Sequence, residues 1–310
     1  MTIPRVDIGI ACSAHQIPSW WGTLFANLMI ESDRGNFQRG QLFAVQSALP
    51  DHNKNHTVGG VFADPIFKLR NERTDANRCA ISGYFLEGAE SGTKSDWLFW
   101  CDDDTVFSDG TISHLLRLDK PFVAGLYFNT NPPYNPIAYK KLDNGGYIPL
   151  WDYDPGGLFQ VDAVGMGCTL VHRSVYEKII EEHEVWQRPN GSLIPMHKSH
   201  IHVTAQGPTM DGMVGNAKEQ IIDGHLVQKL VKPILDDQRK VFPFYLMEHG
   251  RTEDMHFCEL AANVGFKPWV DTTIVCEHWK HKPTRYSDYR QEFIRREIDG
   301  SADEKPEAKE

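Results

Sequence analysis

The chain has 310 residues, of which 41% are hydrophobic and 24% are charged, and its formal net charge is −10. A chain of this length and composition buries one large core, which excludes a disordered or fibrous protein. The acidic balance argues against tight nonspecific binding to polyanions, because such binding depends on clustered Lys and Arg.

In the first third of the chain, segments with the apolar pattern of a strand alternate with segments that have the apolar pattern of a helix. Strands are expected at 6–12, 42–47 and 97–101, and helices at 20–32 and 75–91. This alternation is typical of a parallel sheet with crossover helices. Ligands of such sheets bind at the carboxyl ends of the strands.

The rest of the chain continues this pattern around one long irregular stretch. We expect further elements in this order: a helix at 108–118, a strand at 122–127, a turn-rich loop at 129–136, an apolar run at 159–171, helices at 174–184 and 253–264, and a last strand at 267–278. The stretch 183–244 has no clean period, apart from a helix expected near 220–237, and is interpreted as an insertion or active-site flap. We therefore expect one domain over 1–299 and a disordered tail over 300–310.

No targeting or membrane segment is expected. A run of about 18 consecutive apolar residues is absent from the sequence, and the N-terminus lacks the charged and then apolar layout of a signal peptide. The expected location is the cytoplasm. A zinc site is not expected either, because the six cysteines form no CxxC pair and the spacing of His197, His200 and His202 fits neither a helix face nor a strand face.

Three adjacent carboxylates, Asp102, Asp103 and Asp104, follow the apolar run 97–101. They repel one another, so a fold that places them at a strand end needs a cation or strong donors to hold them. Hard oxygen ligands suit Mg²⁺ or Mn²⁺. If the extended geometry persists, Asp102 and Asp104 point to one side and Asp103 to the other. The alternative is an acidic turn that caps a helix beginning near Asp109.

A hydrophobic strand that ends in an Asp-x-Asp motif resembles the GT-A glycosyltransferases, especially the family 2-like bacterial and phage enzymes. The segment Asp75-Ala-Asn-Arg-Cys-Ala80 is similar to their Ala-Arg-Asn-containing helix, with the order of Asn77 and Arg78 altered. This departure leaves open which of Arg73, Asn77 and Arg78 meets the nucleotide. These residues could equally be exposed polar residues of an amphipathic helix.

The segment 252–271 is similar to the Glu-Asp helix of the same enzymes, which is followed by a Gly-Phe-Lys turn and a strand. The resemblance implies that Asp254, with Glu253 as second candidate, faces the acceptor and acts as general base when the reaction inverts the anomeric centre. Such a carboxylate must lie within hydrogen-bond reach of the acceptor hydroxyl. The alternative is an ordinary first turn of a helix, where the helix dipole favours acids.

Two further matches complete the resemblance over roughly 6–279. His278 follows the last strand, where family members commonly present a metal-ligating His. Gly165-Met-Gly167 resembles the small-residue segment that borders the acceptor and the donor sugar, since glycines allow a ligand to approach the backbone closely. The two glycines could instead mark a β-bulge.

The resemblance implies a GT-A (Rossmann-like) α/β fold, with a mixed, mostly parallel sheet flanked by helices and an insertion on the acceptor side. It also implies a metal-dependent transferase that uses a UDP- or GDP-linked sugar and Mn²⁺ or Mg²⁺. The implied metal ligands are Asp104, His278 and Asp102, and the implied donor-binding residues are Ser13, Arg73, Asn77, Asp102, Asp103, Gly165 and Gly167. The acceptor would be a glycan or another hydroxyl-bearing molecule. The net charge counts against a nucleic acid acceptor without excluding it.

Two other functions stay open. A nucleotidyltransferase would also use paired acids and a metal, although it should show a Gly-rich phosphate loop after the first strand, and the segment 11–18 is not one. A non-catalytic carbohydrate- or nucleotide-binding protein could use the same fold. Such a protein would usually have lost one of the acids or the His.

Overall fold

A mixed sheet of eight strands forms the centre of the computed structural model. The structure describes residues 3–12, 32, 34–35, 37–46, 66–67, 74–88, 92–187, 192–204, 207–210, 219–222, 225–228, 232–233, 242–248, 250–279, 283–284, 286–287, 289–291 and 294. The strands of the central sheet are β1 (Arg5–Cys12), β2 (Gln38–Gln46), β3 (Ile66–Phe67), β4 (Trp97–Asp102), β6 (Phe122–Leu126), β9 (Leu158–Gln160), β11 (Cys168–His172) and β19 (Trp269–Val275). Their order across the sheet is β3-β2-β1-β4-β11-β6-β19-β9.

The pairing of these strands confirms the expected mixed α/β architecture. Strand β1 runs parallel to β2 and β4, β2 runs parallel to β3, and β19 runs parallel to β6. Strand β11 is antiparallel to both of its neighbours, β4 and β6, and β9 is antiparallel to β19. The inverted strand β11 therefore brings its first residues to the edge of the sheet where β4 and β6 end.

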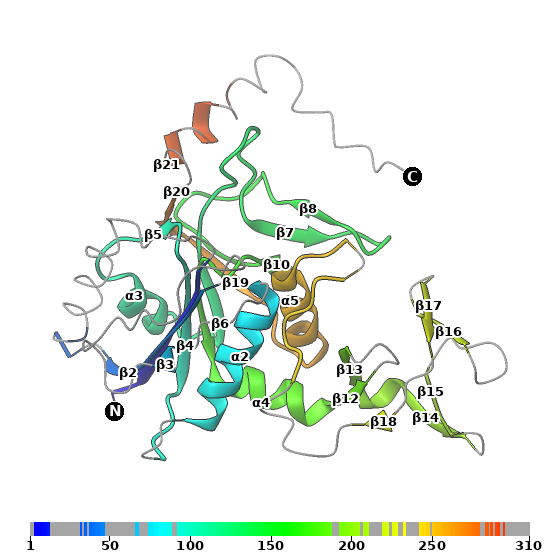
Figure 1. The fold of residues 1–310 in the computed structure, drawn as a ribbon. Helices are drawn as coiled ribbons and strands as arrows, with labels where there is room; N and C mark the ends of the chain where they lie inside the picture. The colour runs from blue at the N-terminus through cyan, green and yellow to red at the C-terminus, as the bar shows by residue number, and fades with distance from the viewer. Residues whose placement is uncertain are drawn as a thin grey trace, which may run out of the picture.

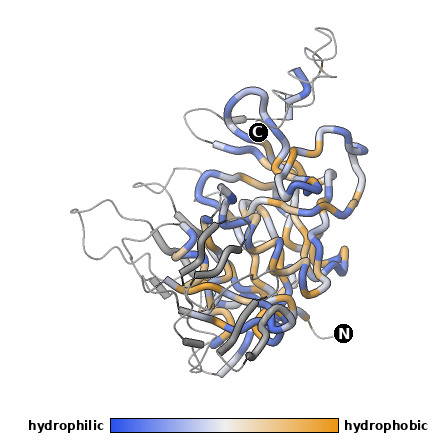
Figure 2. The backbone as a smooth tube through the Cα atoms, turned by 90° about the vertical axis from the view of Figure 1, so that its right-hand side faces the viewer, coloured by the Kyte–Doolittle hydropathy of each residue, from blue (hydrophilic) through white to orange (hydrophobic). Residues whose placement is uncertain are grey.

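Helices cover both faces of the sheet (Figure 1). Helices α2 (Thr74–Glu87), α4 (Arg173–Glu182) and α5 (Glu253–Asn263) pack on one face, and α3 (Thr111–Arg117) packs on the other. Successive strand residues point to opposite faces, so Trp100 joins the core under the first group and Phe99 the core under α3. Each large buried side chain of this kind contributes about 1.5–3 kcal/mol. The hydrophobic residues accordingly follow the central strands in Figure 2.

Two small sheets stand at the carboxyl edge of the central one and were not expected from the sequence. The first contains β7 (Ala138–Lys141), β8 (Tyr147–Pro149) and β10 (Ala163–Val164). The second contains β5 (Thr105–Val106), β20 (Glu277–Trp279) and β21 (Pro283–Thr284). The last strand expected at 267–278 is thus two strands, β19 and β20, which belong to different sheets.

The expected helix near 220–237 is wrong. The structure has strands there, within the described residues: β16 (Glu219–Ile222) pairs with β17 (His225–Gln228), and β18 (Lys232–Pro233) pairs with β12 (His183–Gln187). The dipeptide Asp223-Gly224 separates two β-branched runs, and this pattern favours a hairpin over a helix. The other elements of this stretch are β13 (Leu193–His197), η1 (Lys198–His200), β14 (Ile201–Thr204) and β15 (Gly207–Met210).

Several expectations fall on parts of the chain that the structure does not describe. The helix at 20–32, apart from Ser32, and the tail at 300–310 lie outside the described residues. Within the described part of the chain, none of the helices combines the length and apolarity required to cross a bilayer. The single domain over 1–299 and the cytoplasmic location stay predictions.

Candidate active site

The acid triplet lies where β4 ends, and its three side chains have different surroundings. Asp102 is the last residue of β4, and the chain then turns through Asp103 and Asp104 before β5 begins. Asp103 is buried, whereas Asp102 and Asp104 are partly exposed, at 22% and 26% of their side-chain surface. The turn ends the strand alternation expected for the triplet, so Asp102 and Asp104 meet different partners.

Asp104 meets His278 across the small sheet that contains β5 and β20. Strand pairing sets His278 opposite Thr105, and the backbone N–H of Trp279 donates to the backbone carbonyl of Asp104 at 2.6 Å. The His278 Nε2 lies 3.2 Å from the Asp104 Oδ2. Burial lowers the pKa of His278, but the hydrogen bond and the charge of Asp104 raise it more, to above its ordinary value.

This pair has a donor set that fits Mn²⁺ or Mg²⁺. The other ring nitrogen of His278, Nδ1, lies 2.8 Å from the carbonyl of Phe128, which can only accept a hydrogen bond. In the neutral ring the proton therefore sits on Nδ1, and the lone pair of Nε2 faces the Asp104 carboxylate. A carboxylate oxygen and an imidazole nitrogen that converge in this way can hold one divalent cation.

The described residues provide no complete set of protein ligands for a metal ion. Among the residues that the structure describes, no group of three or more His, Cys, Asp or Glu side chains is arranged to hold a metal ion. Asp102, expected as a third ligand, gives its Oδ1 to Arg78 instead, at 2.7 Å. A cation held by Asp104 and His278 would take its remaining oxygens from water or from a bound ligand, as Mg²⁺ commonly does.

Arg78 connects the end of β4 with the beginning of α5. Its side chain is only 2% exposed, and its Nε lies 3.6 Å from Glu253 Oε1 and 3.5 Å from Asp254 Oδ1. Burial alone would lower the pKa of this guanidinium, but Asp102, Asp254 and Glu253 together raise it well above its ordinary value. The alternative interpretation of exposed polar residues is therefore wrong for Arg78, and also for Asn77, which is fully buried on the same helix.

Asp254 lies in the first turn of α5 and faces two donors. Its Oδ2 accepts from the backbone N–H of Met166 at 3.3 Å, and its Oδ1 faces Arg78. Burial raises the pKa of Asp254 to about 7, against the attraction of Arg78 and with the repulsion of Glu253 and Asp102. A carboxylate with this pKa accepts a proton at neutral pH far more readily than an exposed aspartate does.

The glycines of Gly165-Met-Gly167 have a packing reason that the sequence did not reveal. A Cβ on Gly165 would lie 2.1 Å from the Tyr127 hydroxyl oxygen, and a Cβ on Gly167 would lie 2.8 Å from the Tyr127 Cζ. The Gly167 N–H donates to that hydroxyl at 3.0 Å. Both glycines thus make room for a tyrosine, and their role at a ligand stays a prediction.

Tyr127 is the site residue that the sequence interpretation missed. It follows β6 at the carboxyl edge of the sheet, and its ring meets His278 edge-on at 5.5 Å between centroids. Burial, and then the charges of Asp102 and Asp254, raise its pKa well above the ordinary value, so it remains a neutral phenol. Its position after a buried strand, like that of the acid triplet, could have marked it as a candidate.

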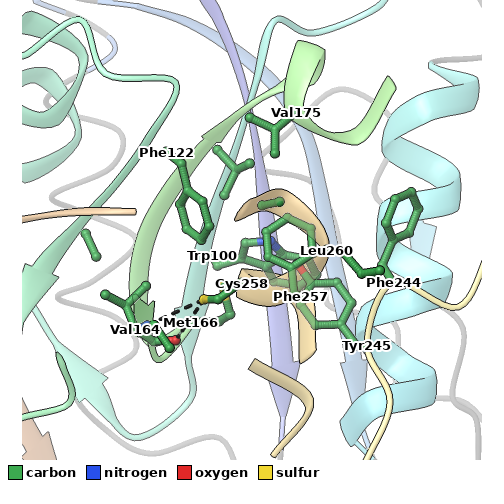
Figure 3. Packing of buried hydrophobic residues seen from close by; sticks show 14 of the residues in the cluster. Trp100, Phe122, Val164, Met166, Val175, Phe244, Tyr245, Phe257, Cys258 and Leu260 are labelled. Carbon is green, nitrogen blue, oxygen red and sulfur yellow. Dashed lines mark hydrogen bonds between the residues drawn. The ribbon is translucent and has the colours of Figure 1, made fainter. Parts of the chain in front are cut away.

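The apolar side of α5 fixes this helix against the sheet (Figure 3). Phe257 stacks on Tyr245 at 4.8 Å, and Tyr245 meets Trp100 edge-on. The Cys258 Sγ lies 3.5 Å from the backbone N of Val164 and 3.6 Å from its carbonyl oxygen. Cys258 is one of five free thiols in the described part of the chain.

The structure thus brings together Asn77, Asp102, Asp103, Asp104, Gly165, Gly167, Glu253, Asp254 and His278 at one end of the sheet. Ser13 and Arg73 lie outside the described residues. The side chains of His200 and His202 are also outside the described part, so the expected absence of a zinc site there is not tested.

Comparison with known proteins gives little beyond this geometry. No protein-family model and no curated protein matches the sequence. Among solved structures, the chain is similar to A197 from STIV, with a TM-score of 0.41 and 11% identity, over 90% of this chain and 86% of that chain. It is also similar to GalNAc-T7, solved with UDP, GalNAc and Mn²⁺, with a TM-score of 0.45 and 9% identity, over 94% of this chain and 48% of that chain. Because both TM-scores are below 0.5, neither similarity carries an argument about function.

Proposed function

We propose that this protein is a metal-dependent glycosyltransferase of the GT-A type, which moves a sugar from a UDP- or GDP-linked donor to an acceptor hydroxyl. The observation that carries the proposal is the meeting of two groups at the carboxyl end of β4. Asp104 pairs with His278 at 3.2 Å, and the neighbouring Asp102 is joined through Arg78 to Asp254. One carboxylate–imidazole pair and one partly buried carboxylate of raised pKa are the parts that such a transfer requires.

The metal-binding part of the site is assigned to Asp104 and His278. A divalent cation held there supplies electrostatic stabilisation of the negative charge on a nucleoside diphosphate leaving group. Asp104 contributes a carboxylate oxygen, and His278 contributes the Nε2 whose orientation is fixed by the carbonyl of Phe128. Asp102 and Asp103 would face the nucleotide sugar, with Asn77, Gly165 and Gly167, and with Ser13 and Arg73 as predicted from the sequence.

The acceptor part of the site is assigned to α5. If the reaction inverts the anomeric centre, Asp254 takes the proton of the acceptor hydroxyl as its oxygen attacks the anomeric carbon. A pKa raised to about 7 suits this transfer, because a general base works best when its pKa lies near the ambient pH. Glu253, buried beside it, keeps a second negative charge near the base.

A panel of UDP- and GDP-linked sugars, with and without Mn²⁺, tests the proposal. Binding is followed by thermal shift and turnover by release of the nucleoside diphosphate. We expect one nucleotide family to stabilise the protein in a Mn²⁺-dependent manner. We expect Asp104→Asn to abolish that dependence, because it removes the charge of one of the two assigned ligands.

Asp109→Asn is the matched control, since Asp109 is exposed and pairs with Arg34 at 3.0 Å outside the site. It should behave as the wild type. Stabilisation by a nucleotide sugar without any turnover, even with simple sugar acceptors, would favour the non-catalytic binding protein. Absence of binding by every member of the panel, with or without metal, would reject the glycosyltransferase.

A further inference from the structure

Arg78 is more deeply buried than an arginine that contacts a soluble ligand needs to be. Its side chain is 2% exposed and lies beneath the acids, with its guanidinium carbon 5.3 Å from the centroid of the Trp100 ring. The sequence predicts Arg78 as one of three residues that meet the nucleotide, and in the structure its guanidinium lies among three acids of the protein, Asp102, Glu253 and Asp254. The role of Arg78 therefore lies in its interaction with these three acids.

The three carboxylates around Arg78 come from two elements that are remote in the chain. Asp102 closes β4, while Glu253 and Asp254 open α5. The guanidinium of Arg78 is the positive charge that balances all three carboxylates. Its shortest contact, 2.7 Å, is to Asp102. Without this guanidinium, three negative groups would share a space with little solvent, and their mutual repulsion would separate the end of β4 from the first turn of α5.

Asp254 is held from a second side as well. Its Oδ2 accepts from the Met166 N–H at 3.3 Å, and the chain just beyond Met166 is tied to β4, because the Asp102 N–H donates to the Gly167 carbonyl at 3.3 Å. The two oxygens of one carboxylate thus contact two segments that both connect to Asp102. This arrangement fixes the direction in which Asp254 points.

We propose that Arg78 is a positioning residue: its guanidinium holds the end of β4 and the first turn of α5 in register, so that the metal side and the acceptor side of the site stay aligned. This inference rests on the proposed function for its catalytic consequence. The breadth of the guanidinium matters here: its Nη2 donates to Asp102 while its Nε lies 3.5 Å from Asp254 and 3.6 Å from Glu253, a spread of contacts that the point charge of an ammonium group does not reproduce.

A second buried arginine provides a matched control. Arg173 is 9% exposed, stacks on Phe85 at 4.2 Å, and donates to the carbonyls of Ser95, Leu86 and Phe85. It fixes the end of α2 through backbone acceptors and is placed in no part of the candidate site. A substitution of Arg173 therefore reports the cost of disturbing a buried arginine in this fold.

The experiment compares Arg78→Lys with Arg173→Lys, using the panel sugar that the wild type turns over with Mn²⁺. We expect Arg78→Lys to lower kcat roughly 10- to 100-fold, because Asp254 is misplaced, and also to raise KM for the donor, because Asp102 loses its shortest contact. Arg173→Lys should keep kcat within about twofold at temperatures where it is folded. Equal losses in kcat for the two variants, or an unchanged kcat in Arg78→Lys, would overturn the inference.

A stability cycle decides the same question without any activity. Arg78→Met leaves the acids unpaired, and adding Asp254→Asn removes one of the charges that Arg78 balances. We expect the double variant to melt about 2–4 °C above Arg78→Met alone. If Asp254→Asn lowers the melting temperature in the Arg78→Met background, Arg78 does not hold Asp254. A wild type that turns over no nucleotide sugar would reject the proposed function, and this cycle would still test the positioning role.

Discussion

Two aspartates at opposite ends of the sheet, one buried and one partly buried, show how differently the fold uses one kind of side chain. Asp7, near the start of β1, accepts from the Ser95 hydroxyl at 2.5 Å and from the Gln41 N–H at 2.6 Å. Burial raises its pKa to about 6. Asp254, at the other end, keeps 19% of its side chain exposed and has a pKa raised to about 7, but its partners are one backbone N–H and an arginine shared with two other acids.

The difference lies in what surrounds each carboxylate. Two neutral donors converge on the same oxygen of Asp7, and Gly40 leaves no space above it, since a Cβ there would lie 1.9 Å from Oδ1. Asp254, in contrast, lies near the positive charge of Arg78 and the negative charges of Glu253 and Asp102. A raised pKa therefore does not identify a catalytic group by itself. The position of the aspartate relative to the strand ends, and whether its partners are neutral or charged, distinguish an aspartate with a structural role from a candidate base.

The largest expected effect is a difference in kcat between the variants of the two aspartates. We expect Asp254→Asn to lower kcat by about 10²- to 10⁴-fold, because the amide cannot take the acceptor proton. Asp7→Asn should leave kcat within about twofold, since Asp7 lies at the far end of β1. Release of the nucleoside diphosphate measures both. Equal losses for the two variants would show that Asp254 acts only through the fold.

The pH dependence of stability should reveal Asp7. Its pKa is raised from 3.8 to about 6 in the folded protein, so between these values the folded state binds more protons than the unfolded chain. The free energy of unfolding should therefore fall as the pH rises from 4 to 6, by on the order of 2–3 kcal/mol from this group. Urea denaturation of wild type and Asp7→Asn over this range measures the difference. A wild type with the same slope as the variant would contradict the shift.

The smallest expected effect is the change in the free energy of unfolding when a glycine near either aspartate is replaced by alanine. Gly40→Ala and Gly165→Ala should each lower the free energy of unfolding by about 1–3 kcal/mol, because each Cβ would meet an oxygen at 1.9 Å or 2.1 Å. Only Gly165→Ala should also lower kcat, since it would displace Tyr127 beside His278. Gly146→Ala is the control, because its nearest contact would be 3.2 Å. A loss of kcat in Gly40→Ala at 25 °C, with the protein folded, would break the comparison.

The parts of the fold that the sequence predicts are those encoded within a few neighbouring residues. The apolar run of β4 and the acids after it were predicted because a buried strand is continuous in the sequence. Helix α5 was predicted from its acidic first turn and from Gly265, which ends the helix with a φ of 94°. The parallel pairing of β1 with β2 and β4 followed from the alternation of such elements, whereas the mixed sheet was expected only from the resemblance to the GT-A glycosyltransferases.

The parts that could not be predicted depend on pairing across long distances in the chain. The two-residue strand β5 exists only because β20 lies beside it, and this pairing is what brings His278 to Asp104. The inversion of β11 likewise depends on β4 and β6 and on no local pattern. The sequence predicts Arg78 as a candidate, yet its position among three acids depends on where α2, the end of β4 and the start of α5 meet.

The hydrogen bond between His278 and the Phe128 carbonyl joins residues 150 positions apart. During synthesis, the acid triplet and β6 therefore emerge from the ribosome long before His278. Closing so long a loop is slow. The growing chain consequently has no Asp104–His278 pair until His278 has been synthesised. If this pair binds the proposed cation, metal uptake there should follow the pairing of β20 with β5.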